Sequence, residues 1–224
     1  MKLLALDTAA SRCSVALLLD GALTELEVPA ERIQAESVLP LVEQLLTDAG
    51  IRLKQLDAVA FGRGPGAFTG LRVAAAVAQG LAFGTGLPVV PVSNLAALAA
   101  AAHRRHGSRR VLACLDARLR EVYWGAFTAG PDAIESLTAE ALCPPTEIAP
   151  PSTGPWFGAG SGWGAYGDAL KARVSALEGV DTELSATAGD IVRLAEKAFK
   201  RGVALPPDQA LPVYLRDNVA TPKL

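Results

Sequence analysis

Nine consecutive residues, Gly64 to Arg72 (GPGAFTGLR), constrain the fold more than any other stretch of the chain. They join a predicted buried strand, 57–62, to an alanine-rich segment with helical spacing. Pro65 fixes φ at about −65° and the flanking glycines adopt positive φ readily, so the turn is rigid and leaves backbone N–H groups free. With Thr69 as the expected N-cap, the turn and the positive end of the helix dipole predict an anion-binding site. The alternative is a connector that needs glycine only for its bend.

The composition indicates a large apolar core without a strong overall charge. The 224 residues are 50% hydrophobic, and 21 Lys and Arg against 23 Asp and Glu give a net charge of −2. A chain with this charge balance does not attract polyanions by itself, so we expect any nucleic acid to be held by a partner protein. Cys13, Cys114 and Cys143 lack CxxC spacing, which favours a reducing cytoplasm over disulfides or a zinc ribbon. No apolar run reaches the roughly 18 residues that a membrane span needs, and Asp7 interrupts the apolar start.

Strands and helices are predicted in alternation along the chain. The opening is a β-meander over 2–7, 12–19 and 22–28, with a hairpin turn at Asp20–Gly21. Helical spacing of apolar residues predicts helices over 33–49, 69–83, 94–103, 168–177 and 188–200. Between them, apolar runs predict further strands over 57–62, 87–92, 110–116 and 121–128.

The pattern of the first strand is repeated at Arg110. KLLALDTA (2–9) and RVLACLDAR (110–118) both place a basic residue before an apolar strand that ends in Asp, at Asp7 and Asp116. The alternatives are an internal duplication and a chance likeness of two apolar strands. Because α/β sheets bind ligands at the carboxyl ends of their strands, the pattern predicts two aspartates that face each other across a cleft. Arg118 or Arg120 is a candidate partner for Asp116.

Several catalytic chemistries lack their sequence signature. Neither GxxxxGKS nor GxxxxGKT occurs, which excludes a P-loop. Residues 162–167 fit GxGxxG but open no βαβ unit, so they do not favour a dinucleotide site. His103 and His106 lie among arginines, which favours a solvated helix C-terminus over a metal site. GxSxG is absent and no serine or cysteine has an evident base, so no catalytic residue is predicted.

The GPGAFTGLR segment, the LALDTA start and the PVYLR tail together resemble the TsaB (YeaZ) family. Its members are non-catalytic paralogues of TsaD in the biosynthesis of threonylcarbamoyladenosine in tRNA. The resemblance covers essentially the whole chain. It implies an α/β, two-lobed actin-like ATPase (ASKHA, ribonuclease H-like) fold with a duplicated β-meander plus helices, divided into lobes 1–107 and 108–224.

The resemblance also implies a function and a set of partners. TsaD transfers the threonylcarbamoyl group to the adenosine next to the anticodon, and its metal-binding HxxxH pair would fall at Asn94 and Leu98 here. Since these residues are poor metal ligands, we expect no metal and a non-catalytic, cytoplasmic subunit that stabilises TsaD. TsaE joins the complex, a homodimer forms without TsaD, and tRNA is contacted only through the complex. The competing hypothesis is a stand-alone ATP-dependent phosphotransferase or a peptidase of the actin-like superfamily.

Two groups of residues are predicted to form binding sites, one for TsaD and one for an anion or nucleotide. Family helices that dock onto TsaD correspond to 36–49 and 69–83, the second with a small-residue face. The expected interface comprises Val38, Val42, Leu45, Gly70, Leu71, Ala74, Ala75 and Ala78. The expected anion or nucleotide cleft, which would take ATP or ADP at the lobe interface, comprises Asp7, Gly64, Gly66, Asp116, Gly158, Gly160 and Gly162. Relatives often carry a histidine just before the serine of the first helix, where this chain has Glu36 before Ser37. Any role of that histidine therefore does not apply to this chain.

Overall fold

The computed structural model describes residues 1–29, 34–131, 133–151 and 154–216. The first half contains β1 (Lys2–Asp7), β2 (Arg12–Leu19), β3 (Ala22–Pro29), α1 (Gln34–Asp48), β4 (Ala58–Gly64), α2 (Phe68–Thr85), β5 (Val89–Ser93) and α3 (Asn94–His106). The second half contains β6 (Arg110–Asp116), β7 (Val122–Ala129), β8 (Ile134–Ser136), β9 (Ala141–Cys143), β10 (Trp156–Ala159), α4 (Ser161–Lys171), β11 (Leu177–Asp181) and α5 (Ala188–Lys200). Short 3₁₀ turns are η1 (Leu53–Gln55), η2 (Pro145–Glu147) and η3 (Pro207–Gln209).

The two halves build sheets with the same plan. The first sheet has the strand order β3-β2-β1-β4-β5 and the second β8-β7-β6-β10-β11, with β9 also paired to β7. In the first, β1 pairs antiparallel with β2 and parallel with β4; in the second, β6 pairs antiparallel with β7 and parallel with β10. The duplication predicted from the sequence is therefore confirmed, and Asp7 and Asp116 end equivalent strands.

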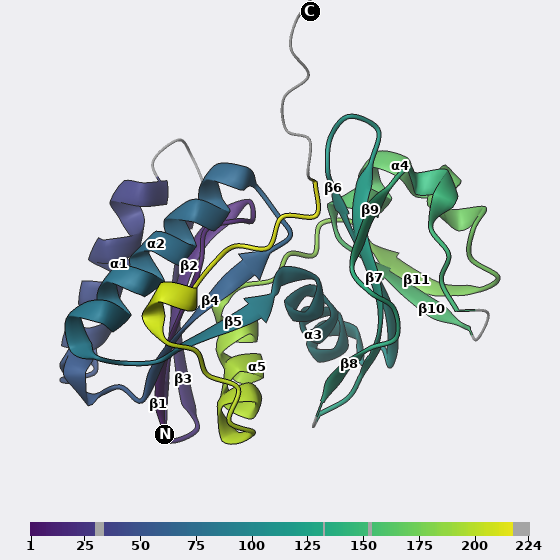
Figure 1. The fold of residues 1–224 in the computed structure, drawn as a ribbon. Coiled ribbons are helices and arrows are strands. Elements are labelled where there is room, and N and C mark those ends of the chain that lie inside the picture. Colours follow the sequence, from purple (N-terminus) through teal and green to yellow (C-terminus); the bar gives the residue numbers. More distant parts are fainter. Residues whose placement is uncertain (30–33, 132, 152–153, 217–224) are drawn as a thin grey trace, which may run out of the picture.

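The helices interlock the two sheets. Figure 1 shows α1 and α2 on the outer face of the first sheet, α4 on the outer face of the second, and α3 and α5 between them. Although α3 follows β5, it packs on β6 and β7, and although α5 follows β11, it packs on β1 and β2. Of the predicted lobes, 1–107 and 108–224, each thus holds one sheet and lends one helix to the other.

Alternating side chains place the core on both faces of each sheet, as the pleat of a strand requires. In β1, Leu4 and Leu6 join the buried cluster with α1 and α2, whereas Leu3 joins the cluster of α3 and α5. In β6, Val111 lies in that same central cluster, and Leu112 packs with α4. The central cluster therefore belongs to both halves.

The prediction for the fourth helix is wrong. Of its residues, 168–177, the first four end α4, which begins at Ser161; 172–176 form a connection, and Leu177 begins strand β11. The helix begins earlier than predicted, in a segment that contains Gly162, and glycine is needed there because a Cβ at Gly162 would lie 2.9 Å from Cys114 Cβ. Gly160, with φ of 100°, supplies the left-handed residue just before the helix.

Of the other predicted helix starts, one lies outside the described residues and one lacks its predicted cap. The start at Ile33 lies outside the described residues. Thr69 is not an N-cap, because α2 begins at Phe68 after Ala67 and no side chain caps it. None of the helices in the described ranges has the length and hydropathy to cross a bilayer.

Candidate functional site

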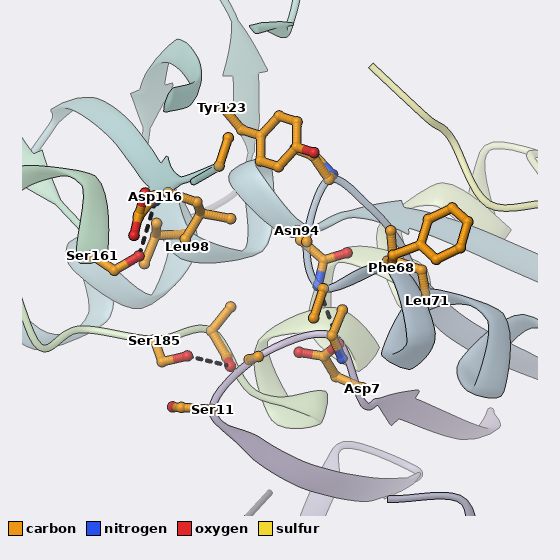
Figure 2. Close-up of a pocket in the computed structure, with 18 of the residues that line it drawn as sticks. Asp7, Ser11, Phe68, Leu71, Asn94, Leu98, Asp116, Tyr123, Ser161 and Ser185 are labelled. Carbon is orange, nitrogen blue, oxygen red and sulfur yellow. Dashed lines mark hydrogen bonds between the residues drawn. The ribbon is translucent and has the colours of Figure 1, made fainter. Parts of the chain in front are cut away.

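A cleft of about 930 Å³ lies between the two sheets, at the carboxyl ends of β1 and β6. Figure 2 labels lining residues from the first half (Asp7, Ser11, Phe68, Leu71, Asn94 and Leu98) and the second half (Asp116, Tyr123, Ser161 and Ser185). Two predicted site residues, Asp7 and Asp116, thus lie on walls formed by different sheets. Strand ends that meet at one edge are where α/β folds bind ligands.

Asp7 is a fully buried carboxylate that lacks part of its hydrogen bonding. Its Oδ1 accepts from Ala9 N at 3.0 Å and from Asn94 Nδ2 at 3.1 Å. Its Oδ2 is buried with no hydrogen-bond partner among the described residues. Burial disfavours the charged form and raises the pKa of Asp7 from 3.8 to about 6, although the bonds from Ala9 and Asn94 partly offset this.

Asn94 ties three strand ends together at the base of the cleft. It is the first residue of α3, which follows β5, and its Nδ2 donates to Asp7 at the end of β1. Its Oδ1 accepts from Gly64 N at 2.8 Å, at the end of β4. A Cβ at Gly62 would lie 2.8 Å from Asn94 Nδ2, so the close approach of this pair requires glycine there.

Asp116 on the other wall is held by its own loop. Its carboxylate accepts from Arg118 N at 2.8 Å and from Arg118 Nη1 at 3.0 Å. Arg118 is therefore the partner of Asp116 among the two arginines considered from the sequence. Arg118, Leu119 and Arg120 all have positive φ, at 61°, 54° and 63°, an uncommon run for residues other than glycine.

Backbone N–H donors of the predicted anion-binding turn are used in hydrogen bonds within the protein itself. Gly66 lines the cleft, but Gly64 N donates to Asn94, and Ala67 N donates to Ala9 O at 3.1 Å. These two N–H groups are thus not free for an anion.

The other predicted cleft glycines are outside the lining. A Cβ at Gly64 would lie 2.9 Å from Val213 O, and one at Gly158 would lie 2.6 Å from the ring of Trp163. A Cβ at Gly160 would lie 2.6 Å from Cys114 O, and Gly162 packs against the same cysteine. These four positions need glycine for close packing rather than for contact with a ligand.

Comparisons with known proteins agree with this architecture. Residues 28–224 match the model of a protein family described as "TsaD: tRNA N6-adenosine threonylcarbamoyltransferase". The chain is 40% identical to the tRNA threonylcarbamoyladenosine biosynthesis protein TsaB of Escherichia coli, over 100% of this chain and 98% of the relative. The chain belongs to the TsaB family. TsaB of Haemophilus influenzae is 38% identical, over 100% and 97% of the two chains. A solved structure described as "YeaZ from Pseudomonas aeruginosa" is 46% identical with a TM-score of 0.90, over 96% and 99%.

The charged side chains that line the cleft of this TsaB-family chain do not favour a nucleoside triphosphate. Its lining carries three acids, Asp7, Asp116 and Glu183, against two cations, Arg118 and Arg216. Both cations are already paired, Arg118 with Asp116 and Arg216 with Glu121. Triphosphates need unpaired cations or free backbone N–H groups. ATP or ADP in this cleft would therefore have to compete with Asp116 and Glu121 for the two arginines.

The residues predicted to bind a TsaD-like partner lie inside this chain's own core. All eight are buried. At most 4% of the residue surface is exposed at Val38, Val42, Leu45, Leu71, Ala74, Ala75 and Ala78, and Gly70 is buried as well. All of them except Gly70 and Leu71 belong to the buried cluster that packs α1 and α2 onto the first sheet. A docking surface on these helices would therefore consist of their other faces.

Those other faces expose apolar side chains. Phe83 is 83% exposed, Leu39 49% and Phe68 39%. A shallow groove of about 530 Å³ between α2 and η3 is lined by Ala76, Gln79, Gly80, Phe83, Pro207 and Asp208. Of these three side chains Phe83 lines the groove, and a large exposed apolar side chain beside a groove is typical of a protein interface.

Sequence reasoning missed two functional features. Asn94 was considered only as a replaced metal ligand, although it orients Asp7. Arg216 belongs to the PVYLR motif, but no neighbouring residue in the sequence predicts its pairing with Glu121. His103 and His106 do lie in the last turn of α3, where they contact Ser108 O and Asp181. Within the described ranges, no group of three or more His, Cys, Asp or Glu is placed to hold a metal.

Proposed function

We propose that this chain is a non-catalytic subunit that binds and stabilises TsaD. In that complex, N6-threonylcarbamoyladenosine is formed next to the anticodon of tRNAs that read codons beginning with A. The observation that carries the proposal is the full-length likeness to proteins named tRNA threonylcarbamoyladenosine biosynthesis protein TsaB. TsaE as a third member, a homodimer in the absence of TsaD and a cytoplasmic location are parts of the same proposal.

The packing at Asn94 and Leu98 supports a non-catalytic role. In TsaD the corresponding positions carry the metal-binding histidines. Asn94 here spends its side chain on Asp7 and Gly64, and Leu98 is 1% exposed within the central core. Leucine has no atom that can bind a metal ion and the Asn94 amide is already hydrogen-bonded, so the pair serves the fold instead.

The exposed face of α2 supports a docking role. Ala76, Gly80 and Gly84 recur every four residues and are exposed, so another helix can approach the backbone of α2 closely. Phe83 beside them offers a large apolar side chain to a partner. We therefore assign the contact with TsaD to this face, rather than to the buried residues of the same helix. Contact with tRNA through the complex agrees with the net charge of −2.

Ala76→Arg is expected to abolish binding to TsaD while the fold stays intact. The side chain at 76 is exposed, so arginine is accommodated in the free subunit but obstructs a helix packed on the groove. Size-exclusion chromatography with light scattering measures complex formation with purified TsaD from the same source. Ala172→Arg, an equal change at an exposed position after α4, is the matched control and binds normally.

Normal binding by Ala76→Arg would show that this face is not the interface. An absence of any complex with TsaD, together with ATP or peptide turnover by the isolated chain, would contradict the proposed function itself. Ala74→Arg is unsuitable for the test, since position 74 is fully buried and arginine there disrupts the core.

A further inference from the structure

The C-terminal segment 211–216, named the strap here, crosses from one lobe to the other at the mouth of the cleft. Figure 1 shows it in yellow, leaving η3, passing α2 and reaching the side of the second sheet. Val213 N donates to Arg63 O at 2.8 Å, at the end of β4. Three residues later, Arg216 Nη2 donates to Ala117 O at 3.1 Å and to Glu121 Oε2 at 2.6 Å, in the loop after β6. The strap therefore contacts both lobes within four residues.

Burial makes these contacts stronger than ordinary surface ion pairs. The Arg216 side chain is 15% exposed and that of Glu121 is 31% exposed. A partly buried, charge-assisted pair is less screened by solvent than an exposed one. Tyr214 packs on Phe68 with ring centroids 5.4 Å apart, which fixes the middle of the strap to the start of α2.

A second ion pair joins the lobes beside the strap. Arg63 Nη2 lies 3.2 Å from Glu140 Oε2, in the segment before β9, and these side chains are 26% and 12% exposed. The carbonyl of the same arginine accepts from Val213. Arg63 thus connects the strap and the second lobe at one point of the first lobe.

We propose that the strap, rather than a bound nucleotide, holds the two lobes together at the cleft mouth, with Arg216 as the positioning residue. A ligand closes a two-lobed cleft when it makes contacts in the closed state that the open state lacks. The strap makes such contacts within the chain itself. It also pairs Arg216, one of the two cations that line the cleft, with Glu121, so a phosphate would have to break that pair to bind this arginine.

The distance between the lobes tests the proposal. Spin labels at Thr47→Cys on α1 and Lys171→Cys on α4, both exposed, are placed in a Cys143→Ser background of the full chain. Double electron–electron resonance then gives the distribution of distances between the labels. We expect a narrow distribution for the parent protein that Mg²⁺-ATP leaves unchanged, and a broader one with a longer mean for Arg216→Gln. Arg216→Lys, which keeps the charge, is expected to restore most of the narrow distribution.

Each outcome of the distance measurement supports or overturns the role proposed for the strap. Arg193→Gln removes an arginine from the exposed side of α5 and serves as the matched control with an unchanged distribution. If Arg216→Gln does not fold by circular dichroism, Glu121→Gln replaces it with the same expectation. A folded Arg216→Gln or Glu121→Gln protein with the parent distribution overturns the proposal. So does a parent protein with a broad distribution that Mg²⁺-ATP narrows.

Discussion

Gly70→Ala is expected to cost at least about 4 kcal/mol of the free energy of unfolding, the upper end for a single substitution. The added Cβ would lie 1.9 Å from Thr8 O and 2.7 Å from Thr8 C, which are backbone atoms that cannot rotate away. In addition, Thr8 Oγ1 donates to Gly70 O at 2.6 Å, so α2 is fixed at this distance from the loop after β1. Urea unfolding followed by circular dichroism measures the loss.

Gly80→Ala is the matched control on the same helix. A Cβ at Gly80 meets no atom within 4 Å, so alanine there only raises helix propensity and gains roughly 0.5–1 kcal/mol. The two substitutions are thus expected to change stability in opposite directions. Similar stabilities for Gly70→Ala and the parent protein would show that α2 moves freely relative to β1. The requirement for glycine at position 70, the third glycine of GPGAFTGLR, would then be a matter of helix propensity alone.

Most of the fold could be predicted because its signals are local. Alternating apolar residues gave the meander, and the Asp20–Gly21 turn has the positive φ values, 48° and 93°, that the hairpin signal requires. The likeness of two strands that end in Asp7 and Asp116 predicted the duplication, which strand order then confirmed. The exchange of α3 and α5 between the sheets had no local signal, because it depends on contacts between halves.

The candidate surfaces were harder to predict, for physical reasons. A small-residue face suits packing against a sheet as well as against a partner helix, and Ala74 and Ala78 pack on the first sheet. Glycines in a turn indicate either ligand contact or close packing, and at Gly158 the neighbour is Trp163. Local spacing cannot distinguish these cases. Arg216 pairs with a residue 95 positions away, so only the folded chain reveals it.

Asp7→Asn is expected to raise the free energy of unfolding at pH 8 by up to about 3 kcal/mol, the equivalent of a two-unit pKa shift. Asparagine keeps the Oδ1 acceptor that Ala9 N and Asn94 Nδ2 use, and it removes a buried charge whose Oδ2 lacks a partner within the described ranges. Urea unfolding of both proteins at several pH values measures the difference. Asp168→Asn, at an exposed position on α4, is the matched control with little change.

The sign of the pH dependence follows from the raised pKa. The folded protein keeps its proton on Asp7 up to a pKa of about 6, whereas the unfolded chain loses it near 3.8. Between these values the folded state binds more protons, so the stability of the parent protein falls as pH rises. The advantage of Asp7→Asn therefore vanishes below about pH 4 and is complete above the folded pKa. An advantage that does not vary with pH, or a loss of stability at pH 8, would contradict the raised pKa.

The same variant separates docking from chemistry in the cleft. Asp7 is fully buried and the proposed docking face of α2 is exposed, so Asp7→Asn is expected to bind TsaD as the parent protein does. A destabilising charge kept in a cleft is typical of a functional residue, since activity and stability often oppose each other. If tRNA modification by the reconstituted complex falls while binding persists, the carboxylate serves a ligand of the complex. If modification is unchanged, docking is the contribution of this chain and the non-catalytic proposal is strengthened.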